Sequence, residues 1–450
     1  MNLKKRVNII FGLQFSQILR FITFLIISSV FTKQNLTHLT RAEIGDFELM
    51  MLISSALSFF WVTGIIQTFL PLYNNNSIFK KRANNLEKSP EIFNTFLLLL
   101  FFSVGFALII YILRNNIYVY KDLRTVPYVN QLVIYFVLSN VTPLVEYIYY
   151  VRNRPYQIVS YVFLLSISQV ILVTVPVILG MGIETSIWGL IIANAIKFIW
   201  LLVLLDRYAE FKFSFAYLKA HFKLGVPLIM SCLLSGSSQY IDGFIASWTS
   251  DPAKFAVFRY GAKEFPFTNS LASGLGNAML TGFSNSYDSK RAMYEIKKKS
   301  LKLMHYLFPI SIVVMLFSNW IYIHLFNKDF GRGADVFMVY LLMIISRLMF
   351  PQTILIGIKK TNIVFWASLI EILLNIAVSL LLIPIYGIVG IALATVIVHV
   401  LEKIYMIIYN YYTLGIAPRQ YIPVSWFLFY SILITIVFVL IDHRVLNINF

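Results

Sequence analysis

Long apolar segments recur from one end of the chain to the other, and short polar segments separate them. A helix that crosses a bilayer needs about 20 apolar residues, and about thirteen segments approach that length. Hydrophobic residues make up 59% of the chain and charged residues 13%, whereas soluble domains are about 25% charged. The sequence therefore predicts an all-α polytopic membrane protein.

The basic residues are distributed unevenly between the two sides of the expected membrane. The formal net charge is +17, with about 22 Lys and Arg in loops on the N-terminal side and about 9 on the other. Cytoplasmic loops carry such an excess, so the N-terminus, with Lys4, Lys5 and Arg6, is expected in the cytoplasm. Membrane topology thus explains the charge, and no nucleic-acid partner is expected.

Six spans are expected in each half of the chain, and one more near its end. The first six are expected at 8–31, 47–72, 92–113, 128–150, 157–180 and 186–205. Two more are expected as continuous helices within 221–288, on either side of a short break at 249–254, and the others at 303–326, 335–357, 362–384, 387–410 and 422–441. The linker 206–222 has the pattern of a short amphipathic helix in the cytoplasmic interface. The segment 285–302 is expected to be a basic cytoplasmic loop.

The second half of the chain echoes the first. Phe11-Gly12 and the helix after it resemble Leu224-Gly225 and the helix that follows. Later, the segment around Gly189 resembles the segment around Gly390 at a similar offset. Their order and near-equal offsets predict a duplicated unit of six helices. We expect an N-terminal lobe at 1–210, a C-terminal lobe at 211–412, and an additional transmembrane helix in 413–450.

Several chemistries have no support in the sequence. Cys232 is the only cysteine, so neither a disulfide nor a thiolate metal site is expected. No Walker A motif and no cluster with metal-ligand spacing occurs. No loop is long enough to resemble the outer domain of a glycan polymerase or ligase. We therefore expect a protein without a cofactor that is not an enzyme.

Three pieces of sequence carry a family resemblance. They are Ala42-Glu43-Ile44-Gly45-Asp46-Phe47, Gly225-Val226-Pro227 with Tyr240-Ile241-Asp242, and Leu382-Ile383-Pro384-Ile385-Tyr386-Gly387-Ile388-Val389-Gly390-Ile391-Ala392-Leu393-Ala394-Thr395. Together with the two six-helix halves, they resemble the MOP superfamily, and most closely its Wzx-type flippases of lipid-linked oligosaccharides. The resemblance covers about residues 1–412, and the third piece is its most specific part. The thirteenth span lies outside the twelve-helix core of that family.

The resemblance implies two parallel six-helix bundles around a central cavity that opens alternately to each side. It also implies an undecaprenyl-pyrophosphate-linked repeat unit as cargo, for O-antigen, capsule or exopolysaccharide, in the bacterial cytoplasmic (inner) membrane. The implied partners are this lipid-linked oligosaccharide, membrane lipids, a proton or sodium ion for coupling, and a polysaccharide polymerase with its chain-length regulator. The alternative is a MATE-like cation-coupled antiporter of drugs or metabolites, against which the basic residues inside the spans weigh.

Basic residues inside the spans are the candidate ligands of the pyrophosphate. Charges are costly in hydrocarbon and usually face a bundle interior or a wet cavity, and the planar fork of arginine donates to two phosphate oxygens at once. Arg20 ranks first because Gln14 and Gln17 share its side of the helix. The other candidates are Lys197, Arg259, Lys263 and Arg347. The alternative is that each base pairs with an acid of the spans: Glu146, Asp242, Glu264, Glu371 or Glu402.

Two acids are candidates for binding the coupling ion. The alternative to ion binding at Asp242 is a salt bridge to Arg259 or Lys263 in the next helix. Glu371 lies on a polar stripe of its helix with Ser368, Asn375 and Ser379, and His399 lies on another with Thr395 and Glu402. For these two stripes, hydrogen bonding between helices is favoured over cation binding.

Overall fold

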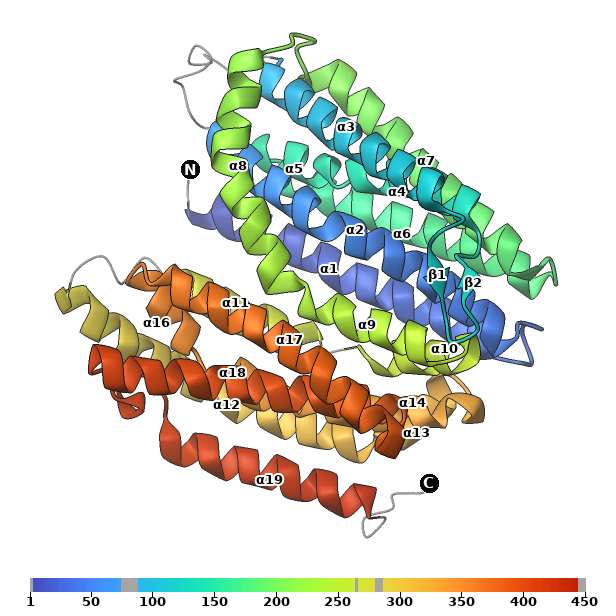
Figure 1. The fold of residues 1–450 in the computed structure, drawn as a ribbon. Helices are drawn as coiled ribbons and strands as arrows, with labels where there is room; N and C mark the ends of the chain where they lie inside the picture. The colour runs from blue at the N-terminus through green and yellow to red at the C-terminus, as the bar shows by residue number, and fades with distance from the viewer. Residues whose placement is uncertain (1–2, 74–87, 264–265, 280–285, 444–450) are drawn as a thin grey trace. The chain divides into compact units, whose positions relative to one another are not determined.

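The described residues of this computed structural model are mostly helical (Figure 1). The description covers the whole chain except residues 1–2, 74–87, 264–265, 280–285 and 444–450. Its one sheet within those limits is a hairpin of β1 (Tyr118–Val119) and β2 (Arg124–Thr125). The expected all-α fold class is confirmed.

Ten helices of the described chain are long and apolar enough to cross a membrane. An eleventh span results if the bent pair Lys328–Arg347 and Pro351–Gly357, which meet at 46°, is taken as one. The ten include Val424–Asp442, which corresponds to the span expected near the end of the chain. The protein is a multi-pass membrane protein, whereas the arrangement as two bundles of six stays a prediction.

The chain divides into two compact units, and each is described here by itself. The first unit contains residues 1–240 and 251–256. Its helices are α1 (Leu3–Thr32), α2 (Arg41–Tyr73), α3 (Pro90–Leu113), α4 (Val129–Val141), α5 (Leu144–Val151), α6 (Pro155–Ile178), α7 (Gly182–Tyr208) and α8 (Phe215–Gly236). Because this unit includes α8, it extends past the lobe boundary expected at residue 210, and the division into lobes stays a prediction.

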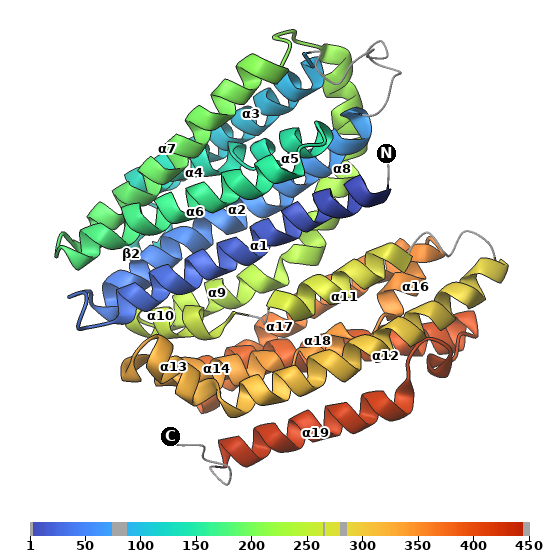
Figure 2. The same cartoon turned by 180° about the vertical axis from the view of Figure 1, so that it is seen from behind.

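The second unit contains residues 241–250 and 257–450, so the boundary falls within α9 (Ser238–Thr249) and α10 (Pro252–Gly261). Figure 2 shows its long helices from behind. They are α11 (Pro266–Met279), α12 (Ser286–Leu316), α13 (Ser318–Leu325), α14 (Gly331–Leu341), α15 (Ile344–Arg347), α16 (Pro351–Gly357), α17 (Thr361–Tyr386), α18 (Ile388–Leu414) and α19 (Val424–Asp442). Short 3-10 turns lie at Lys328–Phe330 and Pro418–Gln420.

Hydrogen bonds in the first unit show which helix ends lie at the same end of the helix bundle. At one end, Ser89 before α3 donates to the carbonyl of Tyr208 at the end of α7 over 2.8 Å, and Arg152 after α5 donates to the same carbonyl over 3.1 Å. At the start of α4, Gln131 donates to Glu184 at the start of α7 over 2.9 Å. The helices therefore run alternately up and down, as successive membrane spans must.

One glycine in each unit lets two consecutive helices pack closely. A Cβ added at Gly189 of α7 would collide with the carbonyl oxygen of Leu172 in α6. A Cβ added at Gly390 of α18 would lie 2.6 Å from the carbonyl oxygen of Leu382 in α17. These are the two glycines that align in the sequence echo, and their equal roles are what a duplicated unit would produce.

The expected helices of the central stretch need correction. The two continuous spans expected within 221–288 are broken into α8, α9, α10 and α11, and none of these is among the ten candidate spans. The break before α10 falls in the connection expected at 249–254, whereas the divisions between α8 and α9 and between α10 and α11 were not expected. Proline at the start of α11 accounts for one of them, because it has no N–H to continue a preceding helix. The sequence also places polar residues on one face of each of these two expected helices, and several of their side chains lie outside the described residues: Ser231, Ser235, Ser238, Ser270, Ser273 and Asn277.

Two expected connections are also different in the structure. Residues 206–222 do not form a separate amphipathic helix, since α7 continues to Tyr208 and α8 begins at Phe215. The expected loop 285–302 is helical from Ser286 onward, as the first part of α12. Its Lys, Glu and Leu are good helix formers, so charge alone was a poor guide to a loop.

Candidate functional site

Arg20 lies near the middle of the 30-residue helix α1 and forms an ion pair with Glu146 of α5. Ser16, one turn earlier on the same face of α1, donates a hydrogen bond to the other carboxylate oxygen of Glu146 over 2.8 Å. The spacing of four residues places both side chains on one face of the helix. Glu146 is buried, but 58% of the Arg20 side chain is exposed, so the guanidinium retains surface that its partner does not cover.

An interruption of the helix between α4 and α5 positions Glu146. The span expected at 128–150 is divided at Thr142 and Pro143, and Glu146 lies in the first turn of the short helix α5 that follows. An acid is stabilised in the first turn of a helix by the helix dipole. Pro143 therefore helps to set the place at which this carboxylate meets α1.

Lys197 of α7 belongs to the same cluster. Its ammonium group donates to the side-chain oxygen of Gln169 in α6 over 2.7 Å, and it is close enough to Arg20 and Glu146 to interact with both charges. Tyrosines of α4, α5 and α6 also lie within electrostatic range of Arg20: Tyr135, Tyr147 and Tyr161. We call Arg20, Glu146 and Lys197 the basic cluster, because two bases and one acid leave a net charge of about +1.

A second polar cluster lies inside the second unit. The carboxylate of Asp242 in α9 accepts hydrogen bonds from Tyr340 of α14 over 2.5 Å and from Thr395 of α18 over 2.6 Å. Asn375 of α17 donates to Thr395 over 3.0 Å. Ser379, one turn further along α17, donates to Asn375 over 3.2 Å. Three helices are therefore tied to one buried aspartate.

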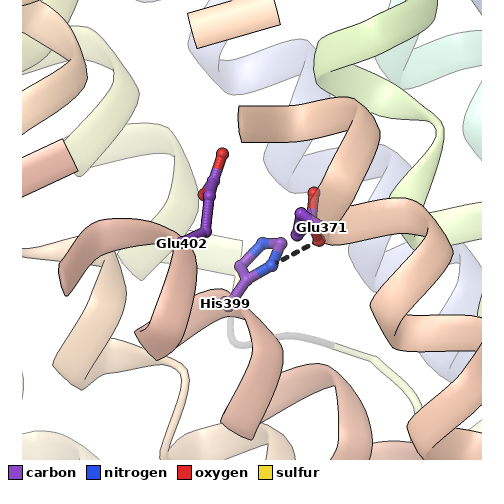
Figure 3. Close-up of side chains that lie close together, drawn as sticks. All are labelled: Glu371, His399 and Glu402. Atoms are coloured by element: carbon purple, nitrogen blue, oxygen red, sulfur yellow. Dashed lines mark ion pairs between the residues drawn. The ribbon is translucent and has the colours of Figure 1, made fainter. Parts of the chain in front are cut away.

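Glu371 of α17 and His399 of α18 form the next contact along these two helices (Figure 3). The carboxylate oxygen Oε1 lies 2.7 Å from Nδ1 of the imidazole, and both side chains are more than nine-tenths buried. Each residue is four positions from a residue of the Asp242 network, namely Asn375 on α17 and Thr395 on α18. The pair therefore extends the same polar face by one turn.

Glu402 and Lys403 complete this cluster on α18. One carboxylate oxygen of Glu402 accepts from Ser368 of α17 over 3.1 Å, and the other lies 2.8 Å from the ammonium of Lys403. Lys403 also contacts the side chain of Gln352 in α16. We call the group Asp242, Glu371, His399, Glu402 and Lys403 the acidic cluster.

The ligand atoms of Glu371, His399 and Glu402 all lie within 4.8 Å of one another, which is close enough for one metal ion. The detailed distances fit a metal poorly. Two ligands of one tetrahedral zinc, each about 2.0 Å from it, are about 3.3 Å apart, and the Glu371–His399 contact of 2.7 Å is shorter. The ammonium of Lys403 already supplies a positive charge to Glu402.

The structure brings some of the expected site residues together. Arg20 and Lys197 meet in the basic cluster, and Arg20 has one of the acid partners that the sequence offered. The other candidate bases belong to the second unit: Arg259 on α10, Lys263 after it and Arg347 on α15. A role of any of these bases in phosphate binding stays a prediction, and Glu264 lies outside the described residues.

In the acidic cluster, Asp242 accepts hydrogen bonds from Tyr340 and Thr395, and Glu371 forms an ion pair with His399 of α18. The expected hydrogen bonding between the stripes of α17 and α18 is present, through Asn375 with Thr395 and Ser368 with Glu402. Ion coupling at Asp242 and Glu371 stays a prediction.

Sequence reasoning missed Gln169, Tyr340 and Lys403. Gln169 and Lys403 are polar residues within strongly apolar helices, and that signal was available. Tyr340 had no such signal, because tyrosine is common throughout the chain and only the packing of α14 against α18 selects this one.

Comparison with known proteins shows which proteins share this fold. A family described as polysaccharide biosynthesis protein matches residues 39–330. A solved structure described as lipid II flippase MurJ in an inward closed conformation is similar, with a TM-score of 0.65 and 16% identity over 98% of this chain and 94% of that one. A search of curated protein sequences found no significant match.

Two other solved structures share the fold. An inward-facing multidrug resistance MATE family transporter of the MOP superfamily has a TM-score of 0.61 and 12% identity over 90% of this chain and 98% of that one. A MOP superfamily transporter from Pyrococcus furiosus has a TM-score of 0.57 and 13% identity over 92% and 96%. The family match covers more than half of the sequence, and the fold agrees with it. The chain belongs to the polysaccharide biosynthesis protein family, and its fold is similar to that of the flippase and the MOP superfamily transporters named above.

Proposed function

We propose that this protein flips an undecaprenyl-pyrophosphate-linked oligosaccharide repeat unit across the bacterial cytoplasmic membrane by alternating access. The product serves O-antigen, capsule or exopolysaccharide assembly. The family description supports a role in polysaccharide biosynthesis, and a protein of similar fold is described as a flippase of a lipid. The proposed orientation, with the N-terminus in the cytoplasm, follows from the excess of basic residues on that side.

The observation that carries the proposal is the excess positive charge of the basic cluster. A pyrophosphate must cross about 30 Å of hydrocarbon, and fixed positive charge lowers the barrier for an anion. Glu146 holds Arg20 in place and neutralises one of the two bases, while Lys197 is held by the uncharged Gln169. The exposed part of the Arg20 guanidinium is then available for two phosphate oxygens.

The test replaces Arg20. Arg20→Ala is expected to insert at normal levels but to abolish glycan export, measured as surface glycan and as lipid-linked oligosaccharide accumulating inside the cell. Arg20→Lys is expected to restore export in part, because lysine retains the charge but lacks the fork. Normal export by Arg20→Ala would contradict the proposed phosphate contact.

Arg114→Ala is the matched control. Arg114 follows α3, is partly exposed, donates a hydrogen bond to the carbonyl of Tyr111 one turn earlier, and lies over the ring of that tyrosine. The control removes the same charge from the same unit and should export normally. If Arg20→Ala fails only because the protein is degraded, the pair with Glu146 is structural and the proposed role is wrong.

A further inference from the structure

Segments that are far apart in the sequence meet at one end of the first unit, where α3 begins and α7 ends (Figure 1). The amide of Ser89 donates to the carbonyl of Tyr208 over 2.8 Å, and the amide of Glu210 donates to the carbonyl of Ser89 over 3.1 Å. Both helices are candidate spans, of 24 and 27 residues, and about 20 residues cross the hydrocarbon of a bilayer. The residues at and just beyond Tyr208 therefore lie at the membrane surface.

The segment between α7 and α8 is held against α3 by one buried side chain. Asn94, in the second turn of α3, donates to the carbonyl of Lys212 over 2.8 Å and accepts from the amide of Ser214 over 2.9 Å. With the two bonds of Ser89, these contacts fix the backbone of the segment at both ends.

Three phenylalanines of this surface are turned to the outside. Phe211, Phe213 and Phe215 have exposed fractions of 62%, 60% and 74%. Their backbone is already fixed, so little freedom is lost when they bind. Exposed aromatic rings at a membrane surface insert at the boundary between the lipid headgroups and the acyl chains. These rings therefore suit contact with lipid rather than with water.

Three arginines gather around the ring of Tyr208. The guanidinium carbons of Arg152, Arg207 and Arg154 lie 5.0, 5.4 and 6.0 Å from the centre of that ring. Cation–π contacts stabilise each arginine, but three like charges in one place repel one another. Among the described residues, neither Arg154 nor Arg207 forms an ion pair. A bound anion would relieve the repulsion, and the planar fork of arginine matches a phosphate.

The rest of this end of the unit is basic as well. The segments 88–95, 151–156 and 206–223 together contain seven Lys and Arg and three Asp and Glu, which gives a net charge of about +4. Lys219 and Lys223 follow Phe215 by four and eight positions on α8, and all three are exposed on one face of that helix. A surface that combines aromatic rings with bases is typical of segments that bind anionic lipids.

We propose that this end of the first unit is a binding site for the headgroups of anionic phospholipids, and we call it the Tyr208 surface. Arg154 and Arg207 donate to the phosphate oxygens of a lipid such as phosphatidylglycerol, and the exposed phenylalanines contact the upper part of its acyl chains. A soluble phosphate would satisfy the arginines but leave the phenylalanines in water, so the combination favours a bilayer lipid. The residues of the surface are Arg152, Arg154, Arg207, Phe211, Phe213 and Phe215.

The experiment places the photoreactive residue p-benzoylphenylalanine at the position of Phe213 in the full chain. The protein is reconstituted in liposomes with equal amounts of phosphatidylglycerol and phosphatidylcholine, and mass spectrometry counts the cross-linked adducts of each lipid. Phosphatidylglycerol adducts are expected in an excess of at least about 5-fold, since one base near an anionic surface contributes about this factor. Equal numbers of the two adducts would overturn the proposal, and so would a probe that captures no lipid.

Two pairs of substitutions separate the arginines from charge in general. Arg154→Gln together with Arg207→Gln should return the adducts to about the ratio of the two lipids in the bilayer. The matched control is Arg114→Gln together with Lys121→Gln, which removes the same charge beyond the other end of α3. The control should keep the excess of phosphatidylglycerol. An excess that survives the loss of Arg154 and Arg207 would contradict their contact with the phosphate.

Inorganic pyrophosphate distinguishes a lipid headgroup from a free anion. Added at matched ionic strength, it should leave the adducts unchanged, because it does not engage the phenylalanines. If it displaces phosphatidylglycerol, the arginines bind a soluble anion and the assignment to phospholipid is wrong. The ratio in the chain with all its arginines decides the proposal even if the glutamine variants do not fold. The liposomes contain no cargo, so the result is independent of glycan export by the Arg20 variants.

Discussion

The basic cluster of the first unit and the acidic cluster of the second are built alike but have opposite charge. In both, ionisable side chains of neighbouring apolar helices meet in pairs. In the first, Arg20 and Lys197 outnumber Glu146. In the second, three carboxylates outnumber Lys403. Because of this difference in sign, the basic cluster favours an anion and the acidic cluster favours a cation.

The two clusters also differ in exposure. The side chain of Arg20 is 58% exposed, whereas those of Lys403 and Glu402 are 9% and 6% exposed. A charge that loses its partner in a buried site cannot be solvated, and one at a wetted surface can. The same kind of substitution should therefore have very different costs in the two units.

The largest effect is expected for Lys403→Ala. It leaves Glu402 buried beside two other carboxylates, and removal of one partner of a buried ion pair costs about 3–5 kcal/mol. The measurement is the thermal unfolding of the purified protein in nanodiscs. Lys299→Ala, which breaks the exposed pair with Glu295, is the control and should cost less than about 1 kcal/mol.

The double variant Lys403→Met with Glu402→Gln sharpens this result. It removes both charges and leaves groups of similar size, so most of the lost stability should return. If Lys403→Ala were no worse than Lys299→Ala, the acidic cluster would be hydrated, and the contrast in exposure between the units would be wrong.

A smaller effect is expected for the two equivalent glycines. Gly189→Ala and Gly390→Ala each press a methyl group against a backbone carbonyl of the preceding helix, and overpacking costs about 1–3 kcal/mol. Similar losses in the two unfolding experiments would support the repeat. Gly105→Ala in α3 meets no atom within 4 Å and should not destabilise. A loss for one glycine and none for the other would count against equivalent packing.

Apolar length made most of the fold predictable. The spans expected at 92–113, 362–384 and 387–410 correspond to α3 at Pro90–Leu113, α17 at Thr361–Tyr386 and α18 at Ile388–Leu414, because continuous hydropathy marks a lipid-facing helix. The stretch 221–288 was not predictable in this way. It is less apolar, and its proline and serine residues permit breaks that hydropathy does not register.

The members of the candidate site were easier to predict than their partners. A charge within an apolar span is visible in the sequence, so Arg20, Lys197, Asp242 and Glu371 were found. That Arg20 meets Glu146 depends on the packing of helices 126 positions apart, which no local pattern records. Equal numbers of candidate acids and bases had left all such pairings open.

The smallest effect on stability is expected for Glu146→Gln, and it tests the first unit most directly. The substitution leaves Arg20 without its acid partner but keeps an acceptor for Ser16, which now donates to Glu146. If the exposed face of Arg20, which carries Gln14 and Gln17 as well, is in contact with water, water replaces the lost partner. The cost should then be below about 1 kcal/mol, as for other exposed ion pairs. If that face is in contact with lipid, an unpaired arginine costs at least about 2.5–3.5 kcal/mol.

Thermal unfolding in nanodiscs distinguishes these two environments. The wetted face has a second consequence, because Glu146→Gln raises the charge of the basic cluster by one unit and should tighten the binding of inorganic pyrophosphate, measured by calorimetry on the same samples. Arg20→Gln, which lowers that charge by one unit, is the opposing variant and should weaken binding. A large loss of stability in Glu146→Gln without tighter binding would place Arg20 against lipid, and the basic cluster would then be a structural ion pair rather than an anion site.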